Sequence, residues 1–214
     1  MSDLKEHDGK AENIKQVSCD MSPAFIKGVR EELSEAQVTF DKFHIIKIIN
    51  EAVNAVRKEE AKTNPLLAGA RYALLKNESN LTAKQKIIRD RLCLPGLNLK
   101  SVRALQIRET FQQIYAAPSK EEFEARLKKW YFWATHSRLE PVVKAAKTIK
   151  RHWDGVLNWK ESQINNGLLE GLNSVIQAAK RKARGYKKPH FKTMVYLLTG
   201  KLDFTTVNKV CLPT

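Results

Sequence analysis

Three carboxylates in this sequence stand where acidic side chains can do chemistry. Asp20 and Asp41 each follow a short alternating segment typical of a strand, and Glu170 lies far downstream on a segment with helical periodicity. In a parallel sheet the carboxyl ends of neighbouring strands meet at one edge, where open α/β sheets bind ligands. Two carboxylates placed close together need a cation or a proton, and hard oxygen ligands suit Mg²⁺ or Mn²⁺. The three acids are therefore candidate ligands of a divalent metal.

Each of these residues also has an ordinary structural interpretation. Asp41 precedes a long helix with apolar periodicity, so helix capping is favoured over metal binding there. For Asp20 the two interpretations are evenly balanced. Glu170, on composition alone, is first a solvated surface acid and second a metal ligand. His44, at the entry to the helix after Asp41, is interpreted first as a packing or capping residue.

The segment that carries Glu170 is predicted to form one helix from Asn165 that stops at Gly185. An apolar stripe marks one face, and the other face carries amides and cations around the lone acid. Residues 180–192 contain no acid, and seven of these thirteen residues are Lys or Arg. DNA contact is favoured over simple solubility, because cations at phosphates release counterions and so supply affinity. The candidate DNA contacts are Asn166, Asn173, Lys180, Arg181, Lys182, Arg184, Lys187 and Lys188.

A strand–helix–strand–helix unit is predicted to position Asp20 and Asp41. Its strands are Ile14–Cys19 and Gln37–Phe40, which should be parallel with a right-handed crossover. From residue 64 to 151 the pattern predicts only helices, two of them opened by capping-box sequences at Thr82 and Ser119. The last of these helices, 139–153, is basic and amphipathic, with either a solvated or a phosphate-tracking outer face. The fold class expected is mainly α with a small parallel β unit.

The aromatic run Trp130–Trp133 has two interpretations. Aromatic side chains can stack on nucleobases. The run also continues the apolar stripe of its helix, so burial in the core is favoured.

Composition narrows the class of partner. The 214 residues carry a formal net charge of +15, which predicts attraction to a polyanion, with nucleic acid first and an anionic membrane surface second. No apolar run reaches the ~18 residues of a membrane span. The charged N-terminus is unlike a signal peptide, and three cysteines without paired spacing suit a reduced, cytoplasmic protein. Glycine-rich phosphate loops, zinc-ligand spacings and nucleophile elbows are not found.

Four blocks resemble bacterial insertion-sequence transposases of the ISL-three group in order and spacing. They are residues 19–25, 40–47, 166–173 and 180–186, and the resemblance covers about residues 10–204. It implies a DDE transposase with a ribonuclease-H-like core, which cleaves DNA and transfers strands at insertion-sequence ends using divalent metals. Asp20 matches the second acid of the catalytic trio and Glu170 the third. Asp41 and His44 match a supporting, DNA-contacting block.

The resemblance also implies a division of the chain. Residues 1–13 form a polar N-terminal segment, and 14–62 an incomplete ribonuclease-H-like core of two strands. Residues 63–160 form a large all-helical insertion, 161–204 the final catalytic helix with its basic segment and closing helix, and 205–214 a tail. The first catalytic Asp and its strand are not visible in this sequence. We therefore expect the C-terminal portion of a transposase, truncated and inactive alone.

Two other functions stay open at this stage. One is a non-enzymatic, basic, helical DNA-binding protein that modulates intact transposase. The other is a helical scaffold with incidental charge. The partners expected are insertion-sequence ends and target DNA, with self-association or association with intact transposase, and no membrane. The location expected is the bacterial cytoplasm, at the nucleoid.

Overall fold

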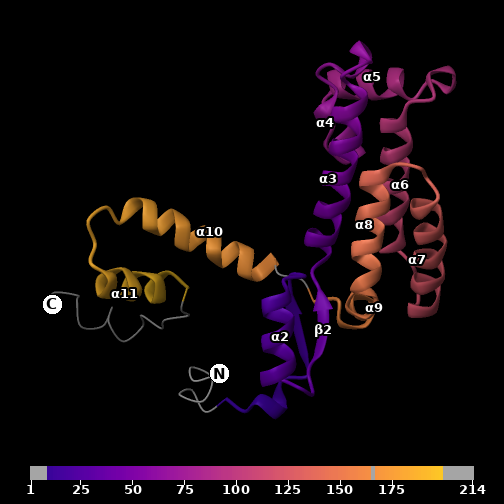
Figure 1. Ribbon diagram of the computed structural model, residues 1–214. Coiled ribbons are helices and arrows are strands. Elements are labelled where there is room, and N and C mark those ends of the chain that lie inside the picture. The colour runs from indigo at the N-terminus through magenta and orange to yellow at the C-terminus, as the bar shows by residue number, and fades with distance from the viewer. Residues whose placement is uncertain (1–8, 165–166, 200–214) are drawn as a thin grey trace. The chain divides into compact units, whose positions relative to one another are not determined.

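The computed structural model describes residues 9–164 and 167–199. The chain divides into two compact units, residues 1–164 (unit 1) and 165–214 (unit 2). Helices dominate both units, and the strands of the described residues form one two-stranded sheet in unit 1 (Figure 1). This confirms the expected mainly α chain with a small parallel β unit.

The elements of unit 1 alternate at first and are then helical throughout. The first four are β1 (Gln16–Cys19), α2 (Pro23–Glu32), β2 (Gln37–Phe40) and α3 (Lys42–Glu60). They are followed by α4 (Arg71–Leu75), α5 (Ala83–Leu92), α6 (Lys100–Ile114), α7 (Lys120–Thr135), α8 (Glu140–Arg151) and α9 (Trp153–Ser162). Short 3₁₀ turns are found at Ala11–Asn13, Pro65–Leu67, Glu78–Asn80 and Pro95–Leu97.

The two strands are parallel, as predicted, and β1 starts two residues later than its sequence pattern indicated. Cys19 lies opposite Phe40 at the last register position. Beyond it, the backbone N–H of Asp41 donates to the carbonyl of Cys19 at 3.2 Å. Asp20 and Asp41 therefore both lie just beyond the C-terminal ends of the two strands, at the same end of the sheet.

A helix that the sequence analysis missed covers β2. The predicted single helix 139–153 is instead two helices, α8 and α9, separated at His152, whose φ of −113° interrupts the helical run. On α9, the Asn158 side chain donates to the carbonyl of Val38 at 2.9 Å. Thr39 Oγ1 donates to Ser162 Oγ at 3.0 Å. These two hydrogen bonds connect α9 to β2. Single polar contacts of this kind do not appear as a periodic pattern in the sequence.

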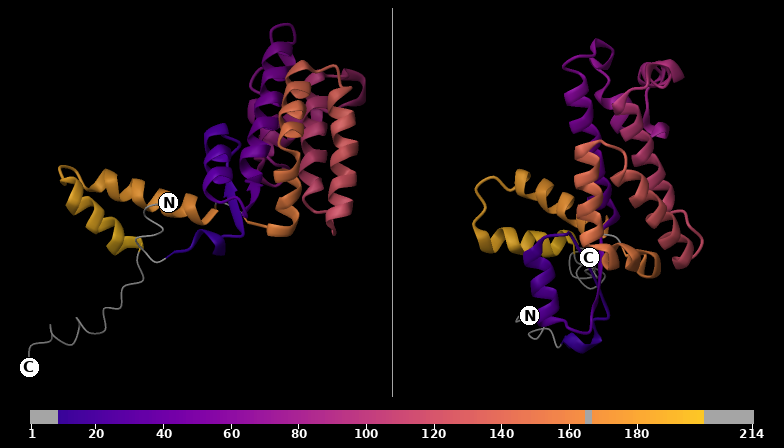
Figure 2. Two further views of the ribbon diagram at one scale, coloured as in Figure 1. Left: turned by 60° about the horizontal axis from the view of Figure 1, so that its bottom comes forward. Right: turned by 45° about the vertical axis from the view of Figure 1, so that its right-hand side comes forward.

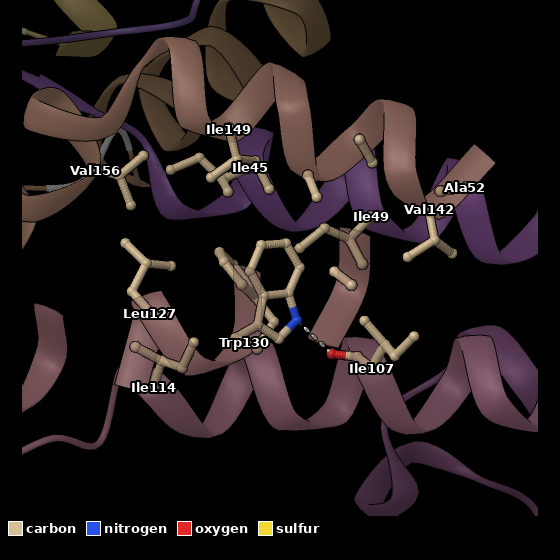
Figure 3. Packing of buried hydrophobic residues seen from close by; sticks show 14 of the residues in the cluster. Ile45, Ile49, Ala52, Ile107, Ile114, Leu127, Trp130, Val142, Ile149 and Val156 are labelled. Carbon is tan, nitrogen blue, oxygen red and sulfur yellow. Dashed lines mark hydrogen bonds between the residues drawn. The ribbon is translucent and has the colours of Figure 1, made fainter. Parts of the chain in front are cut away.

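Helices α3, α6, α7 and α8 pack side by side and enclose the main core of unit 1 (Figures 1 and 2). Trp130 of α7 points into this core, and its indole Nε1 donates to the carbonyl of Ile107 at 2.9 Å (Figure 3). The aromatic run is split, because Phe132 and Trp133 are 64% and 40% exposed. The core interpretation is confirmed for Trp130 and wrong for these two residues. They lie beside the apolar stripe of α7, which consists of Phe123, Leu127, Trp130 and Ala134.

Unit 2 is a pair of helices, α10 (Gly167–Lys182) and α11 (Lys188–Thr199), which pack against each other. Gly185 has a φ of +84°, a backbone conformation that glycine adopts without strain, and it lies in the turn that ends α10 as predicted. Within residues 9–164 and 167–199, no helix has the length and hydropathy of a membrane span.

Candidate metal and nucleic-acid site

Asp20 lies at the C-terminal end of β1, and one of its carboxylate oxygens is occupied by local structure. Its Oδ1 accepts a hydrogen bond from the backbone N–H of Ser22 at 2.8 Å. This bond fixes the turn that leads into α2, where Pro23 occupies the first helical turn. Asp20 itself is partly exposed. The carboxylate is therefore held in position by one oxygen, which leaves the second available to a ligand.

A shallow depression of about 270 Å³ opens beside Asp20. Four side chains of α3 also line it: the apolar Ile48 and three polar residues that recur along one face of that helix, His44, Lys47 and Glu51. Asp20 and His44 were predicted as site residues from the sequence, whereas Lys47 and Glu51 were not. Their spacing of three and seven residues from His44 is a signal that could have identified them.

The described side chains do not complete a metal site by themselves. Across them, no three His, Cys, Asp or Glu side chains gather closely enough to hold a metal ion. Asp20 and Glu51 are hard oxygen donors and His44 is a nitrogen donor, so the depression offers a chemically suitable but partial ligand set. A further acidic ligand is needed before a divalent ion can be held there.

Asp41 acts as the N-cap of α3. Its Oδ1 accepts hydrogen bonds from the backbone N–H groups of Phe43, at 2.7 Å, and His44, at 3.3 Å. The residue is only 2% exposed. Burial, and secondarily the charge of Asp41, raises the pKa of the neighbouring Tyr115 phenol. The capping interpretation is confirmed, and the buried carboxylate is absent from the residues that line the depression beside Asp20.

His44 faces both acids of the β unit. Its ring lines the depression beside Asp20. Its Nδ1 lies 3.5 Å from Asp41 Oδ1, beyond ordinary hydrogen-bond length. The histidine is thus packed at the helix entry, as its ordinary interpretation predicts, with its ring at the edge of the candidate site.

The other predicted site residues belong to unit 2. Glu170 lies on α10, and its side chain is outside the described part of the chain. Asn166 also lies outside the described residues. Asn173 is exposed on α10.

The basic residues of unit 2 form an exposed group around the end of α10. All six of the predicted cationic contacts are solvent-exposed: Lys180, Arg181, Lys182, Arg184, Lys187 and Lys188. Tyr186 lies among them and is 58% exposed. Cations near a helix C-terminus also offset the negative end of its dipole, which accounts for the first three without any ligand. Arg184, Lys187 and Lys188 lie beyond α10, so this local role does not explain them.

Comparison with known proteins places this geometry in a family context. A family model described as a transposase, of the DDE type and the ISL-three group, matches residues 1–195. The transposase for insertion sequence element IS1001 of Bordetella parapertussis is 25% identical over 191 residues, which cover 86% of this chain and 47% of that protein. The transposase for IS1557 of Mycobacterium tuberculosis is 26% identical over 218 residues, which cover 89% and 48%.

The chain spans about half the length of the curated relatives it matches. No solved structure matches it.

Proposed function

The chain belongs to the ISL-three group of DDE transposases, and from this premise we propose that it forms part of a metal-dependent centre that cleaves and joins DNA at insertion-sequence ends. Asp20 and Glu170 are the proposed metal ligands and catalytic acids, and Mg²⁺ or Mn²⁺ is the ion that suits them. The observation that carries the proposal is the partly exposed Asp20 at the C-terminal end of a parallel strand pair, beside a depression that offers further donor groups.

The roles of the remaining residues follow from their positions. Asp41 supports the site by capping the start of α3, the helix that carries His44. Within the described residues β1 is paired along one edge only. A strand that joins its other edge would extend the sheet toward the ribonuclease-H-like core that the family resemblance implies. Such a strand is the proposed source of the first acid, and with Asp20 and Glu170 alone we expect little strand transfer.

When bound, the metal ions would activate the attacking oxygen and stabilise the leaving oxygen of a phosphodiester. The chain's own contribution is to hold Asp20 by its bond to the Ser22 amide and to keep the DNA close through exposed cations. The exposed cations of unit 2 are the proposed contacts to phosphates of the insertion-sequence end or of the target.

A nicking assay on insertion-sequence-end DNA tests the proposal. In Mn²⁺ we expect at most trace nicking by the wild-type chain, because Asp20 and Glu170 alone form an incomplete ligand set. Any such nicking should be lost in the Asp20→Asn and Glu170→Gln variants, while DNA binding is retained in all three. Wild-type nicking that both variants retain would contradict the proposed ligands. Thermal unfolding of each variant controls for misfolding.

The exposed basic residues favour a second candidate function. The exposed cations at residues 180–188 are proposed to contact DNA phosphates, which requires no metal. A non-enzymatic DNA-binding protein that modulates intact transposase, by associating with it or competing for its ends, would show metal-independent binding and no nicking in the same assay.

A further inference from the structure

A groove of about 340 Å³ lies between α6 and α7, on unit 1 and apart from Asp20. Its floor is formed by Ile114 and Trp130, which belong to the core. Its walls carry two polar residues from α6, Thr110 and Gln113, and three residues from α7, namely Arg126, Lys129 and Trp133. We call this the α6–α7 groove.

The indole of Trp133 lies outside the hydrophobic core. It lies one helical turn after the buried Trp130, and 40% of it is exposed at the groove. Trp130 is satisfied by its bond to Ile107, and it packs edge-on against Phe111 at 4.6 Å between ring centroids. The fold therefore explains Trp130, while Trp133 presents part of its indole surface to the groove.

The charge of the groove is positive. Arg126 and Lys129 line it, and no carboxylate does. Arg126 already pairs with Glu122 at 2.7 Å. None of the ion pairs among the described residues involves Lys129, which is exposed one turn before Trp133. A free ammonium beside an exposed indole suits a ligand that has an anionic group next to an aromatic ring.

We propose that the α6–α7 groove binds a nucleotide of single-stranded or unpaired DNA, with its base stacked on Trp133 and its phosphate against Lys129. The side-chain amide of Gln113, which can donate and accept, and the hydroxyl of Thr110 are available to hydrogen-bond the edge of the base. The base must be unpaired, because stacking on a protein side chain requires a face that a duplex buries. The proposal rests on the proposed function only in that the chain acts on DNA, and its residues are distinct from the metal ligands and from the basic residues of unit 2.

Binding of a fluorescent oligothymidylate to the full-length chain, followed by anisotropy, tests this assignment. Aromatic stacking of one base is lost in Trp133→Ala, which should weaken binding by about five- to a hundredfold. Phe132→Ala is the matched control, because Phe132 is a more exposed aromatic of the same helix that stacks on His136 outside the groove. It should change affinity by less than about twofold, and Trp133→Phe should retain most of the wild-type affinity by preserving a stacking surface.

Charge substitutions provide an independent comparison. Lys129→Gln should lower the slope of log K against log salt by about 0.7, the value for one phosphate contact on a single strand. Lys128→Gln should lower it less, since Lys128 pairs with Glu124 at 2.7 Å and does not line the groove. Equal losses for Trp133→Ala and Phe132→Ala, in variants with matched unfolding temperatures, would overturn the proposal.

The oligothymidylate-binding and nicking assays test the groove and the metal site separately. A Trp133→Ala chain that binds oligothymidylate as tightly as the wild type, while Asp20-dependent nicking persists, removes the groove and leaves the proposed function intact. A selective loss of binding in Trp133→Ala, together with nicking that Asp20→Asn and Glu170→Gln both retain, supports the groove and removes the proposed metal ligands.

Discussion

The ring of Phe40 lies directly against the backbone of Gly155. Phe40 ends β2 and is 5% exposed, and a Cβ added to Gly155 would collide with its ring. This close approach lets α9 cover the strand that leads to Asp41. A glycine is needed here for the space it leaves, since its φ is not in the left-handed region.

Replacing Gly155 by Ala should destabilise unit 1. The collision costs about 1–3 kcal/mol, as for other overpacked cores, and is offset in part by the better helix propensity of Ala. We expect a net loss of about 1–2 kcal/mol, measured by urea unfolding. Gly28→Ala on α2 is the control, because nothing lies within 4 Å of the added Cβ, and it should be neutral or stabilising. Equal stability of the two variants would contradict this account of the Phe40 contact.

The role of Asp41 can be separated from that of a metal ligand by a pair of substitutions. Asn caps helices about as well as Asp, whereas Ala cannot accept the hydrogen bonds from Phe43 and His44. Asp41→Ala should therefore lose about 1–2 kcal/mol of unfolding free energy, and Asp41→Asn clearly less, by urea titration monitored with circular dichroism. An Asn variant as unstable as the Ala variant would show that the charge, rather than the cap, is what the fold requires.

Glu109 should be a stabilising residue of the helical part of unit 1. Its carboxylate contacts the guanidinium groups of Arg89 and Arg108, which are 7% and 1% exposed. Burial, and then the charge of Arg89, lowers the pKa of Arg108 to about 10. Glu109→Gln removes the one carboxylate that these two cations share and should cost on the order of 2–4 kcal/mol, because unpaired buried charges are unfavourable.

The control for Glu109 is a carboxylate in an exposed pair. Glu124 pairs with Lys128 on the surface of α7, and Glu124→Gln should change stability by less than about 1 kcal/mol. Thermal unfolding of the three proteins at one pH makes the comparison. If the two glutamine variants unfold at the same temperature, the buried arginines do not depend on Glu109.

The basic residues of unit 2 should control general DNA affinity. Arg184 and Lys187 lie past the end of α10, where the helix dipole does not account for them. Each substitution by Gln should reduce the slope of log K against log salt by about 1 on duplex DNA, and weaken binding equally for all sequences. Lys84→Gln, an exposed cation of α5, is the control and should leave the slope nearly unchanged. Binding isotherms over a range of salt concentrations give the slopes.

The parts of the fold with strong local signals were predictable from sequence. The β1–α2–β2–α3 order follows from alternation, from Pro23 and from the cap at Asp41, and the Thr82–Gln85 capping box forms as its sequence predicts. Helix α9 was missed because it is short, and because its contacts with β2, Gly155 against Phe40 and single polar side chains such as Asn158, carry no periodic signal. The exposure of Trp133 was missed because the whole aromatic run was assigned to the apolar stripe of α7, although of its four residues only Trp130 keeps the helical spacing of that stripe.

The parts of the candidate site that have a local sequence signal were also predictable. Position after a strand identified Asp20, and helix capping was the better interpretation of Asp41 because a buried carboxylate beside two backbone N–H groups is already satisfied. Glu51 and Lys47 were missed because they join Asp20 only through the tertiary packing of α3 against the strand ends. The pairing of Asp20 with Glu170, on a different unit, stays a prediction.

The central claim is that Asp20 and Glu170 hold the same metal ion, and iron-directed cleavage of the polypeptide tests it most directly. Fe²⁺ is bound in place of Mg²⁺ in the presence of insertion-sequence-end DNA, and ascorbate with peroxide then cuts the backbone near the ion. We predict cuts near both residue 20 and residue 170, with both cuts lost together in Asp20→Asn and in Glu170→Gln. Cuts near one residue that survive substitution of the other would contradict the account.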